Sequence, residues 1–190
     1  MTKSIKNVLI AITITLMVMG CGSDDKPNRE AGNYIHFSLA GSLMDGVYHI
    51  EEDSDNPDSS QGMVTGMVIP DLEAGIDLVT LGFTDNSQKL GVTLMFSART
   101  GLFELGDDDM GLSLSITDQN TNNIGDDYTI LVSKSVSLNV QELEMTNLGF
   151  MSTIKRAKGH FNGVVYYEDI VTGEQYSHTI TGDFLVNKFF

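Results

Sequence analysis

The sequence predicts an all-β fold over residues 34–190, either a single antiparallel β-sandwich or a partly open β-barrel. Short segments rich in β-branched and aromatic residues recur at spacings of roughly 8–12 residues, with clusters of Gly, Asp and Asn between them. Several segments alternate apolar and polar residues as strands do, and no segment keeps a helical period. The C-terminal part fits an antiparallel hairpin. We therefore expect roughly eight to eleven strands.

The first half of the chain opens with a strand candidate at residues 34–39, which places Ile35, Phe37 and Leu39 on one face. The further candidates in this half are residues 47–51, 63–69, 76–84 and 90–98. The last two candidates are apolar at almost every position and are joined by a short polar turn. We expect these two to form a hairpin that lies centrally in the sheet or between layers.

The second half continues in the same way. Its strand candidates before the C-terminal hairpin are residues 112–116, 128–132, 136–140 and 150–154. A bulge could prolong the third of them through residues 143–145.

The C-terminal hairpin is the most specific structural prediction. Placing residues 172–173 at its tip pairs Phe161 with Phe184 and Gly163 with Gly182. The apolar side chains of both arms then share one face, and the polar side chains share the other. This stretch is similar to the tails of uncharacterised bacterial β-rich lipoproteins, a resemblance that implies the fold and no activity.

The N-terminus has the features of a cleaved export signal. Lys3 and Lys6 precede a weakly polar run at residues 8–20, which is shorter than the roughly 20 residues of a transmembrane helix. The run ends in the sequence LMVMGC at residues 16–21, which resembles the lipobox of bacterial lipoproteins. Cys21 is the only cysteine of the chain, and lipidation would account for an unpaired cysteine in an exported protein.

The lipobox resemblance implies a division of the chain into three parts. Residues 1–20 are the signal peptide, residues 21–33 a lipidated flexible tether, and residues 34–190 the β domain. Cys21 would carry a diacylglycerol and a further acyl chain such as palmitate, and two or more chains give stable anchoring. Gly22 at the next position implies the outer membrane, with the domain facing the periplasm or the cell surface.

The charge of the chain limits its partners. Loss of Lys3 and Lys6 with the signal takes the formal net charge from −15 to −17. So acidic a protein lacks the basic surface that binding to nucleic acid or lying flat on anionic lipid requires. The expected partners are the membrane through its lipid anchor, and an envelope protein or extracellular ligand that the sequence does not identify.

Calcium is the one cofactor that the sequence suggests, because it binds six to eight oxygen ligands that acidic loops can pool. The candidate ligands in the two acidic clusters are Asp107, Asp108, Asp109, Asp126 and Asp127.

The sequence contains no catalytic motif, and we predict no catalytic residue. The four histidines, His36, His49, His160 and His178, lie singly in strand candidates. His178 is expected to be a half-buried hydrogen-bonding residue rather than a base. The prediction for function is therefore a lipoprotein that acts as a binding or structural module of the cell envelope. Two alternatives stay open: a lipid-anchored hydrolase of glycans or peptides with loop carboxylates, and a lipocalin-like carrier of an apolar ligand.

Overall fold

The described part of the chain consists of strands and their connections. The computed structural model describes residues 32–52, 62–70, 75, 77–85, 90–104, 113–118, 129–147, 152–169 and 172–187. Its strands are β1 (Tyr34–Ala40), β2 (Gly46–Glu51), β3 (Met63–Ile69), β4 (Leu78–Asp85), β5 (Leu90–Ser97), β6 (Gly101–Glu104), β7 (Ser113–Asp118), β8 (Thr129–Asn147), β9 (Ser152–Glu168) and β10 (Gln175–Asn187). The all-β prediction is confirmed.

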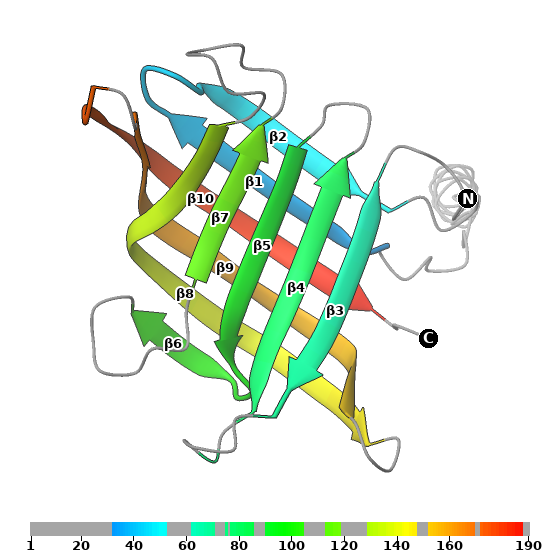
Figure 1. Ribbon diagram of the computed structural model, residues 1–190. Helices are drawn as coiled ribbons and strands as arrows, with labels where there is room; N and C mark the ends of the chain where they lie inside the picture. Colours follow the sequence, from blue (N-terminus) through cyan, green and yellow to red (C-terminus); the bar gives the residue numbers. More distant parts are fainter. Residues whose placement is uncertain are drawn as a thin grey trace, which may run out of the picture. The chain divides into compact units, whose positions relative to one another are not determined.

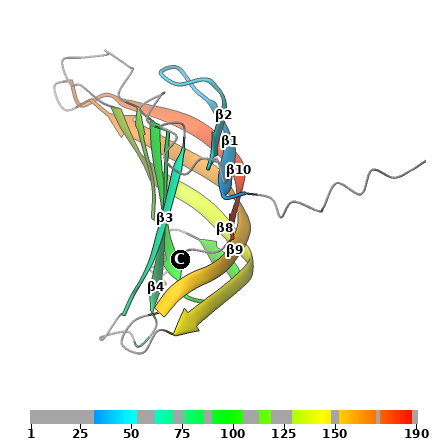
Figure 2. The same ribbon diagram turned by 90° about the vertical axis from the view of Figure 1, so that its right-hand side faces the viewer.

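All the strands belong to one antiparallel sheet (Figure 1). Its order is β2-β1-β10-β9-β8-β7-β5-β4-β3, and β6 pairs with β8 off this path. The sheet curls into a half-barrel, so that β3 and β4 face the layer of β8, β9, β10, β1 and β2 (Figure 2). The partly open barrel was one of the two predicted forms.

Strand β8 carries the sheet from one layer to the other. It pairs with β7 through residues 129–132 and with β9 from Val132 onward. Its pairing with β9 is interrupted by three bulges, the first between Ser133 and Ser135. Bulges bend a strand and increase its twist, so they allow β8 to turn the corner of the half-barrel. The predicted segments 128–132, 136–140 and 143–145 are thus parts of one long, bulged strand.

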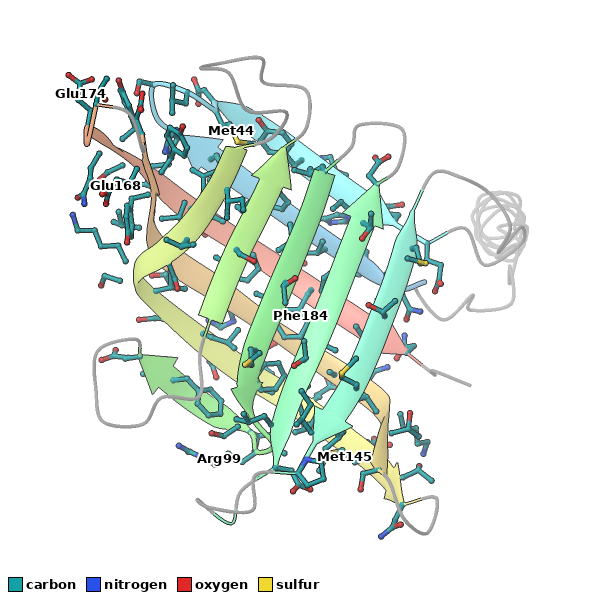
Figure 3. The ribbon with its side chains drawn as sticks, viewed as in Figure 1. Met44, Arg99, Met145, Glu168, Glu174 and Phe184 are labelled. Atoms are coloured by element: carbon teal, nitrogen blue, oxygen red, sulfur yellow. The ribbon has the colours of Figure 1, made fainter. Side chains whose placement is uncertain are left out.

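The core fills the space between the two layers. Buried apolar side chains come from every strand, and Phe184 of β10 lies among them (Figure 3). The ring centroid of Phe184 is 6.5 Å from that of Phe83 on β4 and 6.4 Å from that of Phe96 on β5. These contacts join the opposite layers at the middle of the sheet.

The C-terminal hairpin has the predicted faces but another register. Phe184 lies opposite Gly159, and Phe161 lies opposite Gly182, so the predicted pairs Phe161–Phe184 and Gly163–Gly182 are wrong by two residues. The observed register is favoured because it packs each phenylalanine ring on a glycine of the opposite strand. A Cβ atom at Gly159 would lie 2.9 Å from the Phe184 ring, and one at Gly182 would lie 2.7 Å from the Phe161 ring. Each ring therefore covers a residue without a side chain, as aromatic residues do beside strand glycines.

The turn of this hairpin is longer than predicted. Asp169 pairs with Glu174 through a backbone hydrogen bond of 2.9 Å, and the Gly173 N–H donates to the Asp169 carbonyl at 2.7 Å. The Asp169 carboxylate also accepts a 3.0 Å hydrogen bond from the Thr172 N–H. Buried Asp169 thus organises the tip and sets the observed register.

The predicted hairpin of residues 76–84 and 90–98 is confirmed as β4 and β5, which pair from Leu78 with Ser97 to Asp85 with Leu90. Both strands lie inside the sheet, between β3 and β7. In each of them buried residues alternate with half-buried ones, so only one face packs on the core.

His178 is hydrogen-bonded to the connection between β1 and β2. Its ring is buried, and its Nε2 atom accepts hydrogen bonds from the N–H groups of Leu43 at 3.3 Å and Met44 at 3.1 Å. A protonated ring could not accept these bonds. Burial lowers the pKa of His178 from its ordinary value.

This lowered pKa predicts acid sensitivity. The neutral ring stabilises the fold fully above the unfolded-state pKa of about 6.5, and that stability is lost as the pH falls toward the folded-state pKa. We expect His178→Gln, which keeps an acceptor that does not titrate, to reduce the fall in Tm between about pH 7.5 and pH 5.5. Thermal melts followed by circular dichroism measure this, with His160→Ala as the exposed control. An unchanged pH dependence in His178→Gln would rule out this role.

Candidate metal centre

The candidate site lies on the outer face of β1 and β2. Successive side chains of a strand point to opposite faces. Because Ile35 of β1 and Ile50 of β2 are fully buried, their neighbours His36, His49 and Glu51 lie on the face turned away from the core.

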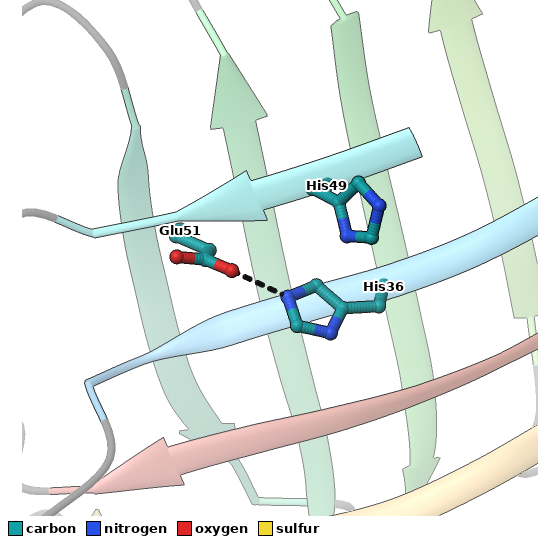
Figure 4. Close-up of side chains that lie close together, drawn as sticks. All are labelled: His36, His49 and Glu51. Carbon is teal, nitrogen blue, oxygen red and sulfur yellow. Dashed lines mark hydrogen bonds and ion pairs between the residues drawn. The ribbon is translucent and has the colours of Figure 1, made fainter. Parts of the chain in front are cut away.

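The register of the two strands brings these three side chains together (Figure 4). His36 lies directly opposite His49, and their ring centroids are 4.6 Å apart at an interplanar angle of 72°. The Nε2 atom of His36 is 2.7 Å from Oε1 of Glu51. One nitrogen or oxygen atom from each of the three residues lies within 4.8 Å of the others. We call His36, His49 and Glu51 the outer-face triad.

Two neighbouring residues, Tyr34 and Asp183, restrict the orientation of the His36 ring. The ring of Tyr34 stacks on His36, with centroids 4.4 Å apart and an interplanar angle of 19°. The Tyr34 hydroxyl donates a hydrogen bond to Asp183, which lies opposite His36 on β10. Burial raises the pKa of Tyr34, and the negative charge of Asp183 raises it further. Tyr34 thus remains a neutral donor and restricts the orientation of the His36 ring.

The surroundings of the outer-face triad are acidic. Asp183 lies one strand away, and His160 follows it on β9, in the same row across the sheet. The sequences of β1, β2 and β10 contain no Lys or Arg. No Lys or Arg of these strands therefore pairs with Glu51 or Asp183, and the face favours a cation. The face is also hollowed beside His36 into a groove of about 360 Å³.

The triad offers two imidazole nitrogens and a carboxylate oxygen. This combination suits zinc and neighbouring transition metals, and with three protein ligands a tetrahedral ion keeps a fourth position for water.

The site residues predicted from the sequence lie elsewhere in the chain. The lipidation site and the calcium candidates are outside the described residues, and both stay predictions: Cys21, Asp107, Asp108, Asp109, Asp126 and Asp127. In the acidic segment after β2, Glu52 accepts a hydrogen bond from the side-chain amide of Asn33.

The outer-face triad was missed because the histidines were considered singly. His49 and Glu51 are two residues apart, which places them on one face of a strand and was visible in the sequence. His36 joins them only through the pairing of β1 with β2, whose register depends on the connection at residues 41–45.

None of the described residues form a helix with the length and apolar character needed to cross a bilayer. A scan of protein-family models, a search of curated proteins and a search of solved structures each gave no match to this chain.

Proposed function

We propose that this chain is a lipid-anchored protein of the bacterial cell envelope, held on the outer membrane through Cys21, that acts by binding. The observation that carries the proposal is the outer-face triad, in which hydrogen-bonding and ionisable side chains converge on an exposed face of the sheet.

The exposure of the triad favours binding over catalysis. The side chains of His36 and Glu51 are 31% and 65% exposed. Active sites generally enclose their substrates, because excluding water strengthens electrostatic interactions in the transition state. An open sheet face provides little such exclusion, whereas it remains accessible to an ion or a partner.

The anchor is supported by the sequence around Cys21, and Asn33 is the point at which the chain is fixed to the β domain. The Asn33 side-chain oxygen accepts a 2.6 Å hydrogen bond from the backbone N–H of Asn187, and its carbonyl accepts one of 2.9 Å from Glu52. Asn33 thus closes the domain at the ends of β10 and β2. Residues 21–32 before it could span about 40 Å when extended, enough to hold the domain away from the membrane surface.

Metabolic labelling tests the anchor. We expect cells that make the full chain to incorporate labelled palmitate into it and to retain it in the outer-membrane fraction. Cys21→Ser should abolish the label and the retention, whereas the neighbouring change Ser23→Ala should preserve both. Retention of an unlabelled wild-type chain in membranes would contradict the proposal.

Protease treatment of intact and lysed cells then determines the side of the membrane. Digestion on intact cells would direct the search for partners to extracellular ligands. Protection until lysis would direct it to proteins of the periplasm.

A further inference from the structure

We infer that the outer-face triad binds a divalent transition-metal ion of the zinc class, with His36, His49 and Glu51 as its ligands. The inference deepens the proposed function, on which it rests for its place in the envelope, by naming the ligand of the exposed face.

The geometry of the strand pair fits such a site. Directly opposed residues of antiparallel strands have Cβ atoms about 4.5–5.5 Å apart, and residues two apart in one strand lie on the same face. His36 faces His49 across the pair, and Glu51 follows His49 on its own strand. Zinc binds nitrogen and oxygen at about 2.0–2.2 Å. Ligand atoms that lie within 4.8 Å of one another therefore need only side-chain rotations to surround one ion.

The contact between His36 and Glu51 does not by itself account for the arrangement. That pair needs only two residues, at the observed distance of 2.7 Å. The His49 ring also lies against His36 in a T-shaped arrangement, which adds a second imidazole to the same point of the surface. Two aromatic nitrogen donors beside one carboxylate form a mixed set that transition metals prefer.

The same donor set selects against calcium and magnesium. Both are hard cations that prefer oxygen ligands, and calcium takes six to eight of them. The triad supplies a single carboxylate, so we expect calcium to compete poorly for it.

Part of the site is prepared before an ion arrives. The Tyr34 ring stacks on His36, and Asp183 accepts the Tyr34 hydrogen bond, which limits the freedom of the first ligand. Fixing a ligand in advance reduces the entropy lost on binding. The carboxylates of Glu51 and Asp183 also supply negative charge to balance the ion.

A titration with zinc tests the inference. The full chain is purified in mild detergent without a polyhistidine tag, stripped with EDTA, and titrated with Zn²⁺ against a chromophoric chelator. We expect one ion per chain and binding that weakens in acid, because the metal displaces protons from its ligands. Millimolar Ca²⁺ should not displace the zinc. Cys21→Ser should bind zinc as the wild type does, since the thiol takes no part.

Matched variants locate the ion. Changes to groups around metal ligands cost about 10–100-fold in affinity, so His36→Gln and His49→Gln, which remove ligands, should each cost at least about 100-fold. Glu51→Gln should cost at least about 10-fold. His160→Gln, an exposed histidine two strands from His36, and Glu168→Gln, an exposed carboxylate at the end of β9, should leave the affinity unchanged. Unchanged Tm values verify that the variants fold.

Three results would overturn the inference: no zinc binding by the wild type, equal losses in His160→Gln and His36→Gln, or displacement of zinc by calcium. A failure of the zinc inference can be distinguished from a failure of the proposed lipid anchor. Palmitate labelling depends on Cys21 and is unaffected by the triad variants, whereas zinc titration is unaffected by Cys21→Ser.

Discussion

Phe184→Ala should lower the free energy of unfolding by about 3–5 kcal/mol, the usual cost of removing a buried phenylalanine ring. Phe184 is fully buried and contacts Phe83 and Phe96 from the opposite layer. Its removal would leave a cavity at the point where the two layers meet, above Gly159, which has no side chain to fill it. We expect a large part of the total stability to be lost, because domains are stable by only about 5–15 kcal/mol.

Urea unfolding of the full chain in mild detergent measures this effect. Far-UV circular dichroism is the suitable probe, since the chain has no Trp. Leu102→Ala is the control, because Leu102 on β6 is 60% exposed and its loss should change stability by less than about 0.5 kcal/mol. Similar stabilities of the two variants would mean that the layers do not pack on Phe184.

Gly163→Ala should destabilise the domain by about 2–6 kcal/mol, through backbone strain and overpacking of about 1–3 kcal/mol each. Gly163 has a φ of +154°, and a Cβ atom there would lie 2.1 Å from the carbonyl oxygen of Ser135. This close approach occurs where the first bulge of β8 shifts the register between Ser133 and Ser135. A side chain at residue 163 would push β8 away at the corner of the half-barrel.

Gly91→Ala provides the matched control for this prediction. Gly91 also lies in a strand, but its nearest neighbour to an added Cβ atom is the Phe83 carbonyl oxygen at 4.0 Å. The substitution should be neutral, or stabilising by up to about 1 kcal/mol, because it restricts the unfolded chain. The same urea titrations compare the two variants. Equal effects would show that the bulge does not require glycine at residue 163.

The strands and their faces could be predicted from the sequence because they depend on local alternation. Ile35 and Phe184 were placed on apolar faces, and both are buried. The register of the last hairpin could not be predicted in this way, because a shift of two residues keeps every side chain on its face. The choice depends on the fit of Phe184 over Gly159 and on the hydrogen bonds of the turn around Asp169, and neither is visible in the alternation of apolar and polar residues.

The full length of β8 and the existence of β6 also could not be predicted from the pattern of apolar and polar residues. The bulges of β8 interrupt its alternation, so one strand looked like several. The four residues of β6 are too few to show a period.

The outer-face triad could likewise be predicted only in part from the sequence. His49 and Glu51 share a strand face by their spacing alone, but only the pairing of β1 with β2 adds His36. The connection between these two strands is hydrogen-bonded to His178, which lies 135 residues after Leu43 in the sequence.

A crystal structure of the zinc-loaded full chain, with anomalous differences recorded at the zinc absorption edge, tests the zinc site most directly. We expect one strong peak on the outer face of β1 and β2, about 2.0–2.2 Å from a nitrogen of His36, a nitrogen of His49 and an oxygen of Glu51. A peak elsewhere on the chain, with none between these three side chains, would contradict it.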